Sequence, residues 1–243
     1  MDVLGTHTRI GFQLSGGKDS VAALFLLRQD WPRMTVYFCD SGDVLDETQS
    51  VLDQIGALVP IVVIRGRTAQ VKQAWGLPTD LLPWSSAYAA HHHNTGETPL
   101  MQDRVACCSR SIMAPLHDRM VEDGITLIIR GQKECDTHKG ALRSGDVVDG
   151  IEYLYPIQGW TDEEALAYIK ENGIIPQRFY DEPGEHSYDC ATCTAWTGTN
   201  RGVYLRKHYP LKFQQYRADM QHVISAVLPC LDTLRKEWEV CHG

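Results

Sequence analysis

Long hydrophobic runs are absent from this chain of 243 residues, and no stretch approaches the length needed to cross a bilayer. The first residues also lack the basic and apolar pattern of a signal peptide. Basic residues are in deficit, because 23 Lys and Arg face 31 Asp and Glu, for a net charge of −8. A surface of that sign repels nucleic acid, so anions would be bound by local basic groups. We expect a cytoplasmic protein without membrane contact; the charge does not indicate a nucleic-acid partner, although it does not exclude one.

The pattern of apolar residues predicts the fold class. Apolar runs at residues 10–14, 34–39, 60–64 and 125–130 alternate with helical patterns such as that at 47–55. Continuous apolar runs between amphipathic helices are typical of parallel strands that are buried on both faces. We therefore expect an α/β fold with a doubly wound, mostly parallel sheet, whose ligands lie at the carboxyl ends of the strands.

The rest of the chain predicts a C-terminal helical segment. Residues 161–164 form a capping-box pattern that starts a helix, and Gly173 ends it. Residues 213–238 also look helical, with an interruption at Pro229. We expect a nucleotide-binding domain over residues 1–200 and a helical extension and tail over 201–243, with oligomer formation left open.

A glycine-containing segment follows the first predicted strand directly, and a helical run begins after it. Backbone N–H groups and the positive end of a helix dipole at such a turn suit a phosphate chain. Glycines let the backbone approach the anion, and a lysine adds positive charge. The alternative is a strand–helix turn without a ligand. The segment reads Ser15, Gly16, Gly17, Lys18, Asp19 and Ser20.

This segment is not a Walker A motif, because Asp19 follows the lysine where Ser or Thr is required. It resembles instead the PP-loop of the ATP pyrophosphatase superfamily. That resemblance implies an adenine nucleotide α-hydrolase-like fold and an adenine nucleotide as ligand.

Two more loops follow predicted strand ends, so three loops can converge on one ligand. One lies after the second strand and the other after the fourth, where a polar segment with basic residues begins. Asp40 could instead cap the next turn, and the basic residues could line a solvated loop. The nucleotide-binding residues expected in these loops are Asp40, Gly42, Arg130, Gly131, Lys133, Lys139 and Arg143.

The chain contains eight cysteines, a number that in a cytosolic protein points to metal binding or catalysis more than to disulfides. Cys107 and Cys108 are adjacent, and Cys190 and Cys193 form a C-x-x-C pair further along the chain. Four thiolates are enough for a [4Fe-4S] cube with one ligand per iron. Structural zinc is the rival, but adjacent helical residues point in different directions, which a cube accommodates better than one small ion. Burial of the cysteines as small hydrophobes is the third interpretation.

Several motifs occur in a fixed order along nearly the whole chain. Together they make the chain resemble the phosphoadenylyl-sulfate (PAPS) reductase family, in particular the iron–sulfur type typified by adenylyl-sulfate reductases. The resemblance implies a cluster on the four cysteines named above. The motifs are Asp40-Ser41-Gly42 with Glu47-Thr48, Cys107-Cys108 with Pro115-Leu116, Tyr155-Pro156-Ile157 with Trp160-Thr161, and Cys190-x-x-Cys193-Thr194.

Two departures from the family bear on the reaction. The reductases usually lack the loop lysine, whereas Lys18 and Asp19 are intact here, as in members that use ATP. The reductases also carry an Arg-Lys pair before the Pro-Leu segment, where this chain has Ser111-Ile112. Only Arg110 remains nearby to couple the cluster to an anionic substrate.

The C-terminus offers a candidate nucleophile. The family carries a thiol in a Glu-Cys-Gly-x-His motif, and this chain ends Glu239-Val240-Cys241-His242-Gly243, similar in composition but not in order. A mobile tail would let Cys241 approach the substrate and then leave. The alternative is an incidental terminal cysteine.

Two reactions follow from these observations. The first is thiol-dependent reduction of adenylyl sulfate or phosphoadenylyl sulfate to sulfite, with the nucleotide on the PP-loop beside a [4Fe-4S] cluster, Cys241 as nucleophile and a thioredoxin-like thiol donor. The second is an ATP pyrophosphatase in which Lys18 and Mg²⁺ steady the phosphates while an acceptor such as DNA or RNA is adenylated and then thiolated. We favour the first hypothesis slightly. The cysteines and tail support it, while the intact loop supports the second.

Overall fold

The computed structural model describes residues 3–88, 99–136, 142–182 and 188–242. The chain divides into two compact units, which are described separately. Unit 1 comprises Met1–Asp40, Val44–Gly66 and Ala114–Asp181, and unit 2 comprises Ser41–Asp43, Arg67–Met113 and Glu182–Gly243. This grouping differs from the division at residue 200 expected from the sequence, since distant segments of the chain share each unit. None of the helices in the described ranges is both long and apolar enough to span a membrane.

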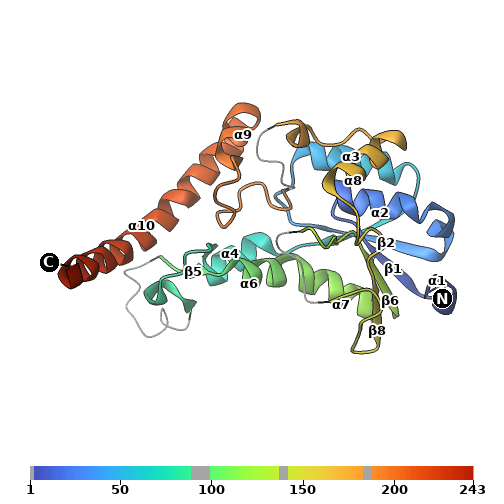
Figure 1. Ribbon diagram of the computed structural model, residues 1–243, viewed down its shortest axis with the longest axis horizontal. Coiled ribbons are helices and arrows are strands. Elements are labelled where there is room, and N and C mark those ends of the chain that lie inside the picture. The colour runs from blue at the N-terminus through green and yellow to red at the C-terminus, as the bar shows by residue number, and fades with distance from the viewer. Residues whose placement is uncertain (1–2, 89–98, 137–141, 183–187, 243) are drawn as a thin grey trace. The chain divides into compact units, whose positions relative to one another are not determined.

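Unit 1 is built on a six-stranded sheet in the order β3-β2-β1-β6-β8-β7 (Figure 1). Every neighbouring pair is parallel except β7 with β8. From β1 the chain continues to β2 and β3 on one side, and later adds β6 on the other side of β1. The strand order therefore reverses beside β1, and ligands usually bind at such a point. The doubly wound, mostly parallel sheet is confirmed. Its strands are β1 (Ile10–Gln13), β2 (Met34–Asp40), β3 (Ile61–Arg65), β6 (Leu127–Arg130), β7 (Val147–Val148) and β8 (Ile151–Leu154).

Helices cover both faces of this sheet (Figure 1). Ile10 and Phe12 of β1 join a core with residues of α2, α3 and α8. Gly11 faces the other way, where a Cβ would collide with Met120 of α7. The capping box at Thr161 starts α8 as predicted. The helical elements of unit 1 are α1 (Val3–Thr6), α2 (Lys18–Leu26), η1 (Arg28–Arg33), α3 (Asp46–Gly56), α7 (Ala114–Glu122), α8 (Asp162–Glu171) and η4 (Arg178–Asp181).

Unit 2 is mainly helical, with one short parallel pair of strands. The long helix α10 continues through Pro229, so the interruption expected there was wrong. Pro229 lies on the exposed side of α10, while Val223 and Val227 pack against Met101 and hold the helix. The elements are α4 (Thr68–Trp75), β4 (Leu77–Pro78), η2 (Trp84–Ser86), β5 (Met101–Gln102), α6 (Arg104–Cys108), η3 (Ser109–Met113), α9 (Arg201–His208) and α10 (Pro210–His242).

Candidate functional site

The predicted phosphate-binding loop forms the turn between β1 and α2 of unit 1. Gly16 has a φ of +82°, and a Cβ there would lie 2.9 Å from Cγ2 of Thr48, so the position favours glycine strongly. The backbone N–H of Ser15 donates to Oγ of Ser20 at 3.1 Å, which closes the turn. Helix α2 begins at Lys18, so the positive end of its dipole lies at the loop.

Two backbone N–H groups of this loop have hydroxyl partners. The N–H of Gly17 donates to Oγ of Ser15 at 3.3 Å, and the N–H of Lys18 donates to the hydroxyl of Tyr180 at 3.0 Å. The sequence predicted N–H groups open to an anion. At these two positions a phosphate oxygen would have to displace a hydroxyl.

The charged groups of the loop form a network of two ammonium and three carboxylate groups. Nζ of Lys133 lies 2.5 Å from Oδ1 of Asp19 and 2.9 Å from Oδ1 of Asp162. Oδ1 of Asp136 lies 3.0 Å from the same nitrogen. Nζ of Lys18 lies 3.1 Å from Oδ2 of Asp19 and 2.9 Å from Oδ1 of Asp162. Both lysines are therefore held by carboxylates.

Burial shows what Lys133 does in this network. The residue is 1% exposed, so its ammonium is enclosed by protein. Burial by itself would lower the pKa of Lys133, but the hydrogen bond and charge of Asp19, with further help from Asp162, outweigh it and raise the pKa. Lys133 thus fixes the loop carboxylate to the start of α8.

Gly131 makes close contact with the loop from the end of β6. A Cβ there would lie 2.5 Å from the backbone N of Ser20 and 2.6 Å from the carbonyl of Asp19. The contact requires a residue without a side chain, which gives Gly131 a packing role beside the loop.

The other predicted nucleotide-binding residues are distributed over both units. Asp40 ends β2 and Arg130 ends β6, both in unit 1. Arg143 is exposed, and its backbone N–H donates to Asp146. Gly42 belongs to unit 2, and Lys139 lies outside the described residues.

The four predicted metal-ligating cysteines all belong to unit 2. Cys107 and Cys108 end helix α6, which begins with an N-cap bond from the backbone of Ala106 to Asp103 at 2.8 Å. The chain then forms the π-helical turn η3. Turns of that kind are rare and occur often at functional sites.

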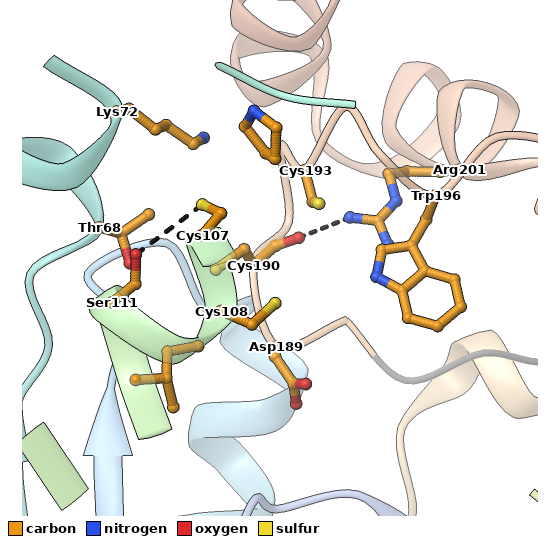
Figure 2. Close-up of a pocket in the computed structure, with 12 residues that line it drawn as sticks. Thr68, Lys72, Cys107, Cys108, Ser111, Asp189, Cys190, Cys193, Trp196 and Arg201 are labelled. Carbon is orange, nitrogen blue, oxygen red and sulfur yellow. Dashed lines mark hydrogen bonds between the residues drawn. The ribbon is translucent and has the colours of Figure 1, made fainter. Parts of the chain in front are cut away.

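The sulfur-bearing side chains from both segments line one cavity of about 130 Å³. Figure 2 shows α6 supplying the first pair of cysteines and the loop at residues 190–193 supplying the second. None of the four forms a disulfide. Lys72, Ser111 and Arg201 are among the other lining residues.

The loop that carries Cys190 and Cys193 is held by the segment after β2. The backbone N–H and the hydroxyl of Thr192 both donate to Oδ2 of Asp43, at 2.8 and 2.7 Å. Nζ of Lys212 lies 2.9 Å from Oδ1 of the same carboxylate. Burial opposes the charge of Asp43, but these bonds outweigh it and lower its pKa.

Burial raises the pKa of three of the thiols in this cavity. Removal from water raises the pKa of Cys108 to about 12, with the neighbouring cysteines adding to the effect. It also raises the pKa of Cys190 to about 12 and that of Cys107. A bound metal would reverse this, since coordination deprotonates a thiol.

The cations near this cavity differ from those expected. Arg110 does not line it, because its guanidinium donates to Gln102 at 2.9 Å and stacks 3.9 Å from the ring centre of Trp75. Lys72 and the buried Arg201 line it instead. We expected neither from the sequence.

Cys241 lies in the last turn of α10 and is exposed. The sequence suggested a mobile tail at this residue, and α10 extends through it to His242. Cys230 is a second exposed cysteine on the same helix. Nothing in the structure distinguishes Cys241 as a nucleophile, so its role stays a prediction.

Several residues that shape the two sites were missed at the sequence level. Tyr180 and Gln177 hold the phosphate-binding loop, the latter through a 2.6 Å bond from its amide to the carbonyl of Gly16. Asp162 lies within the capping-box pattern at the start of α8. Asp136, which pairs with Lys133, lies a few residues after the end of the fourth predicted strand. Their positions give no signal of a contact with a loop so distant in the chain.

One trio of side chains with metal-ligand chemistry lies within 4.8 Å in the described part of the chain. It consists of Cys135, Asp136 and Asp162. Both carboxylates already pair with Lys133, so we assign no metal to this trio.

Comparison with known proteins agrees with the resemblance noted in the sequence. The adenosine 5'-phosphosulfate reductase of Rhodococcus erythropolis is 26% identical over 193 residues, which cover 78% of this chain and 70% of that protein. The enzyme of the same name from Allochromatium vinosum is 21% identical over 186 residues, covering 76% and 68%. The crystal structure of phosphoadenylyl-sulfate reductase from Candida auris, a phosphate complex, matches with a TM-score of 0.50 at 14% identity, covering 74% of this chain and 80% of that one, and so shares its fold.

A family model fits most of the length of the chain. The model of the phosphoadenosine phosphosulfate reductase domain matches residues 9–199, a range that includes the phosphate-binding loop and all four cavity cysteines. The chain therefore belongs to the phosphoadenosine phosphosulfate reductase domain family.

Proposed function

We propose that this protein reduces adenylyl sulfate or phosphoadenylyl sulfate to sulfite with electrons from an external thiol, and that it carries a [4Fe-4S] cluster. The observation that carries the proposal is the cavity of unit 2, into which two distant cysteine pairs converge. Membership of the reductase family and the names of the relatives support the same reaction.

The arrangement of the cysteines along the chain favours a cluster over zinc. Two thiolates on one tetrahedral zinc ion lie about 3.8 Å apart, because each Zn–S bond is about 2.3 Å long. Cys107 and Cys108 are adjacent residues at the end of α6, so their side chains leave the helix in different directions. A cube places its four irons at separate corners, so its thiolates stand further apart. When bound, the cluster would supply a fixed, polarising group to the reaction.

The nucleotide would bind to unit 1 through its phosphates. The left-handed glycine of the loop and the start of α2 suit an anion, and Lys18 lies at that start. Asp19 is tied to Lys133, so the loop keeps its shape while Tyr180 gives up its place to the phosphate. Arg130 would assist at the phosphates, and Arg143 and Lys139 would contact the sulfate.

The sulfur chemistry needs a thiolate, which we assign to Cys241. The thiolate attacks the sulfur of the sulfonucleotide, an S–S bond forms, and the S–O bond to phosphate breaks with release of the nucleotide monophosphate. A thiolate of a thioredoxin-like donor then attacks Sγ of Cys241, which releases sulfite and forms a mixed disulfide. The donor's second thiol attacks that mixed disulfide, which releases the thiolate of Cys241 and leaves the donor as a disulfide, so the dithiol supplies both electrons. Such a donor is found in a reducing compartment such as the cytoplasm.

The decisive experiment compares two substrates with anaerobically purified protein. We expect about four irons per chain, sulfite from adenylyl sulfate or its 3'-phosphorylated form with a dithiol, and no pyrophosphate from ATP and Mg²⁺. Cys241→Ser should abolish sulfite release, while Cys230→Ser on the same helix serves as the matched control. Pyrophosphate release without sulfite would overturn the proposal in favour of ATP-dependent thiolation.

A further inference from the structure

The two residues of the segment after the tandem cysteines that line the cavity, Ser111 and Ile112, are uncharged. Ser111 is 1% exposed and places its hydroxyl 3.9 Å from Sγ of Cys107, and Ile112 is apolar. Arg110 is directed at Gln102 and Trp75 instead. This segment therefore contributes no cation to the lining of the cavity.

Lys72 of α4 brings a positive charge to this cavity from another part of unit 2. Its Nζ donates to Oγ1 of Thr192 at 3.4 Å, and that hydroxyl donates in turn to Asp43 at 2.7 Å. The chain of bonds fixes the ammonium against the loop between Cys190 and Cys193. Figure 2 shows the side chain of Lys72 extended toward Cys107.

Two other cations near the cysteine loop, Arg201 and Lys212, contact protein groups. The guanidinium of Arg201 donates to the carbonyls of Cys190 and Ala191, at 2.5 and 3.3 Å. Asp43 and Lys212 form an ion pair behind the loop. Burial raises the pKa of the Cys107 thiol, and the charges of Lys72 and Arg110 both oppose that effect.

We propose that Lys72 is the positioning residue that sets the electrostatics of the metal–thiolate centre in this cavity. The inference rests on the cluster proposed above. A cluster with four thiolates carries net negative charge, and reduction adds one more negative charge. A fixed ammonium beside the sulfurs therefore stabilises the reduced form and the assembled centre.

The test uses the anaerobically purified holoprotein and four variants. Lys72→Gln and Lys72→Met remove the charge, Lys72→Arg keeps it, and Lys236→Gln removes the charge of an exposed lysine on α10. Iron and sulfide per chain are measured first, then the midpoint potential by poised EPR and absorbance, and finally the rate of iron loss to a chelator.

We expect Lys72→Gln and Lys72→Met to lower the midpoint potential, so that the ratio of reduced to oxidised cluster at a fixed potential falls at least tenfold, or about 59 mV. Iron loss should be several-fold faster in both, and Lys72→Arg and Lys236→Gln should stay near wild type. A loss of iron in both uncharged variants but not in Lys72→Arg would equally support the charge.

Three results would overturn the inference. One is a midpoint potential of Lys72→Gln equal to that of the wild type, with the iron retained. If the cluster cannot be reduced, the equivalent result is an unchanged rate of iron loss to the chelator. Another is loss of iron from Lys72→Arg as well, which would indicate a need for the shape of lysine alone. Wild-type protein without iron would overturn this inference and the cluster together, so the two failures are distinguishable.

Discussion

Gly131→Ala tests whether the end of β6 must pack directly on the phosphate-binding loop. The added methyl would lie 2.5 Å from the backbone N of Ser20, which is 0.9 Å short of the 3.4 Å at which ordinary contact begins. The neighbouring atoms are backbone and cannot rotate away, so the loop and the start of α2 must move. Overpacking of this kind costs about 1–3 kcal/mol. The φ of Gly131 lies outside the left-handed region, so the effect is steric alone.

We expect the thermal midpoint, followed by circular dichroism, to fall by about 2–4 °C for each kcal/mol lost. Nucleotide affinity, measured by calorimetry with adenylyl sulfate, should fall as well, because the loop moves. Gly159→Ala is the matched control in unit 1, since a Cβ there meets no atom within 4 Å. Equal midpoints and affinities for the two variants would refute the packing argument.

Three further predictions concern charged and polar contacts. Lys133→Met leaves the loop carboxylates without their buried counter-ion, so urea unfolding should show a loss of roughly 3 kcal/mol, and wild-type stability would contradict the network. Asp43→Asn removes the charge that holds the C-x-x-C loop, so iron per chain and about 1–3 kcal/mol of stability should be lost, with exposed Asp232→Asn as control. Burial and the bond to Asp123 raise the pKa of Tyr37 from 10.0 to about 12, so its contribution is complete below pH 10 and is lost as the pH rises toward 12. Tyr37→Phe should remove that loss from the pH dependence of unfolding; an unchanged alkaline slope would contradict the assignment.

The sheet was predictable because its signal is local. Four apolar runs indicated β1, β2, β3 and β6, since a strand buried on both faces needs apolar residues throughout. Strand β8 was missed, because only alternate residues in its run Ile151–Leu154 are buried. The helix interruption predicted at Pro229 was wrong for another reason. The packing that holds α10 comes from residues distant in the chain, which a local pattern does not show.

The candidate site was predictable only in part. Residue types and spacing singled out the glycine turn between β1 and α2 and the four cysteines that line one cavity, because glycines at a strand–helix turn and paired thiols are local signals. The partners of these residues had no such signal. Lys133 looked like a phosphate ligand, yet the structure buries it among carboxylates.

The amino-acid order alone therefore determined the family, the sheet and the chemical types at each site. Only the folded chain decided which charges meet, because side chains such as Lys72 and Thr192 lie 120 positions apart and come together through packing. Ion pairs and cavity linings depend on such distant contacts, and local sequence patterns carry no record of them.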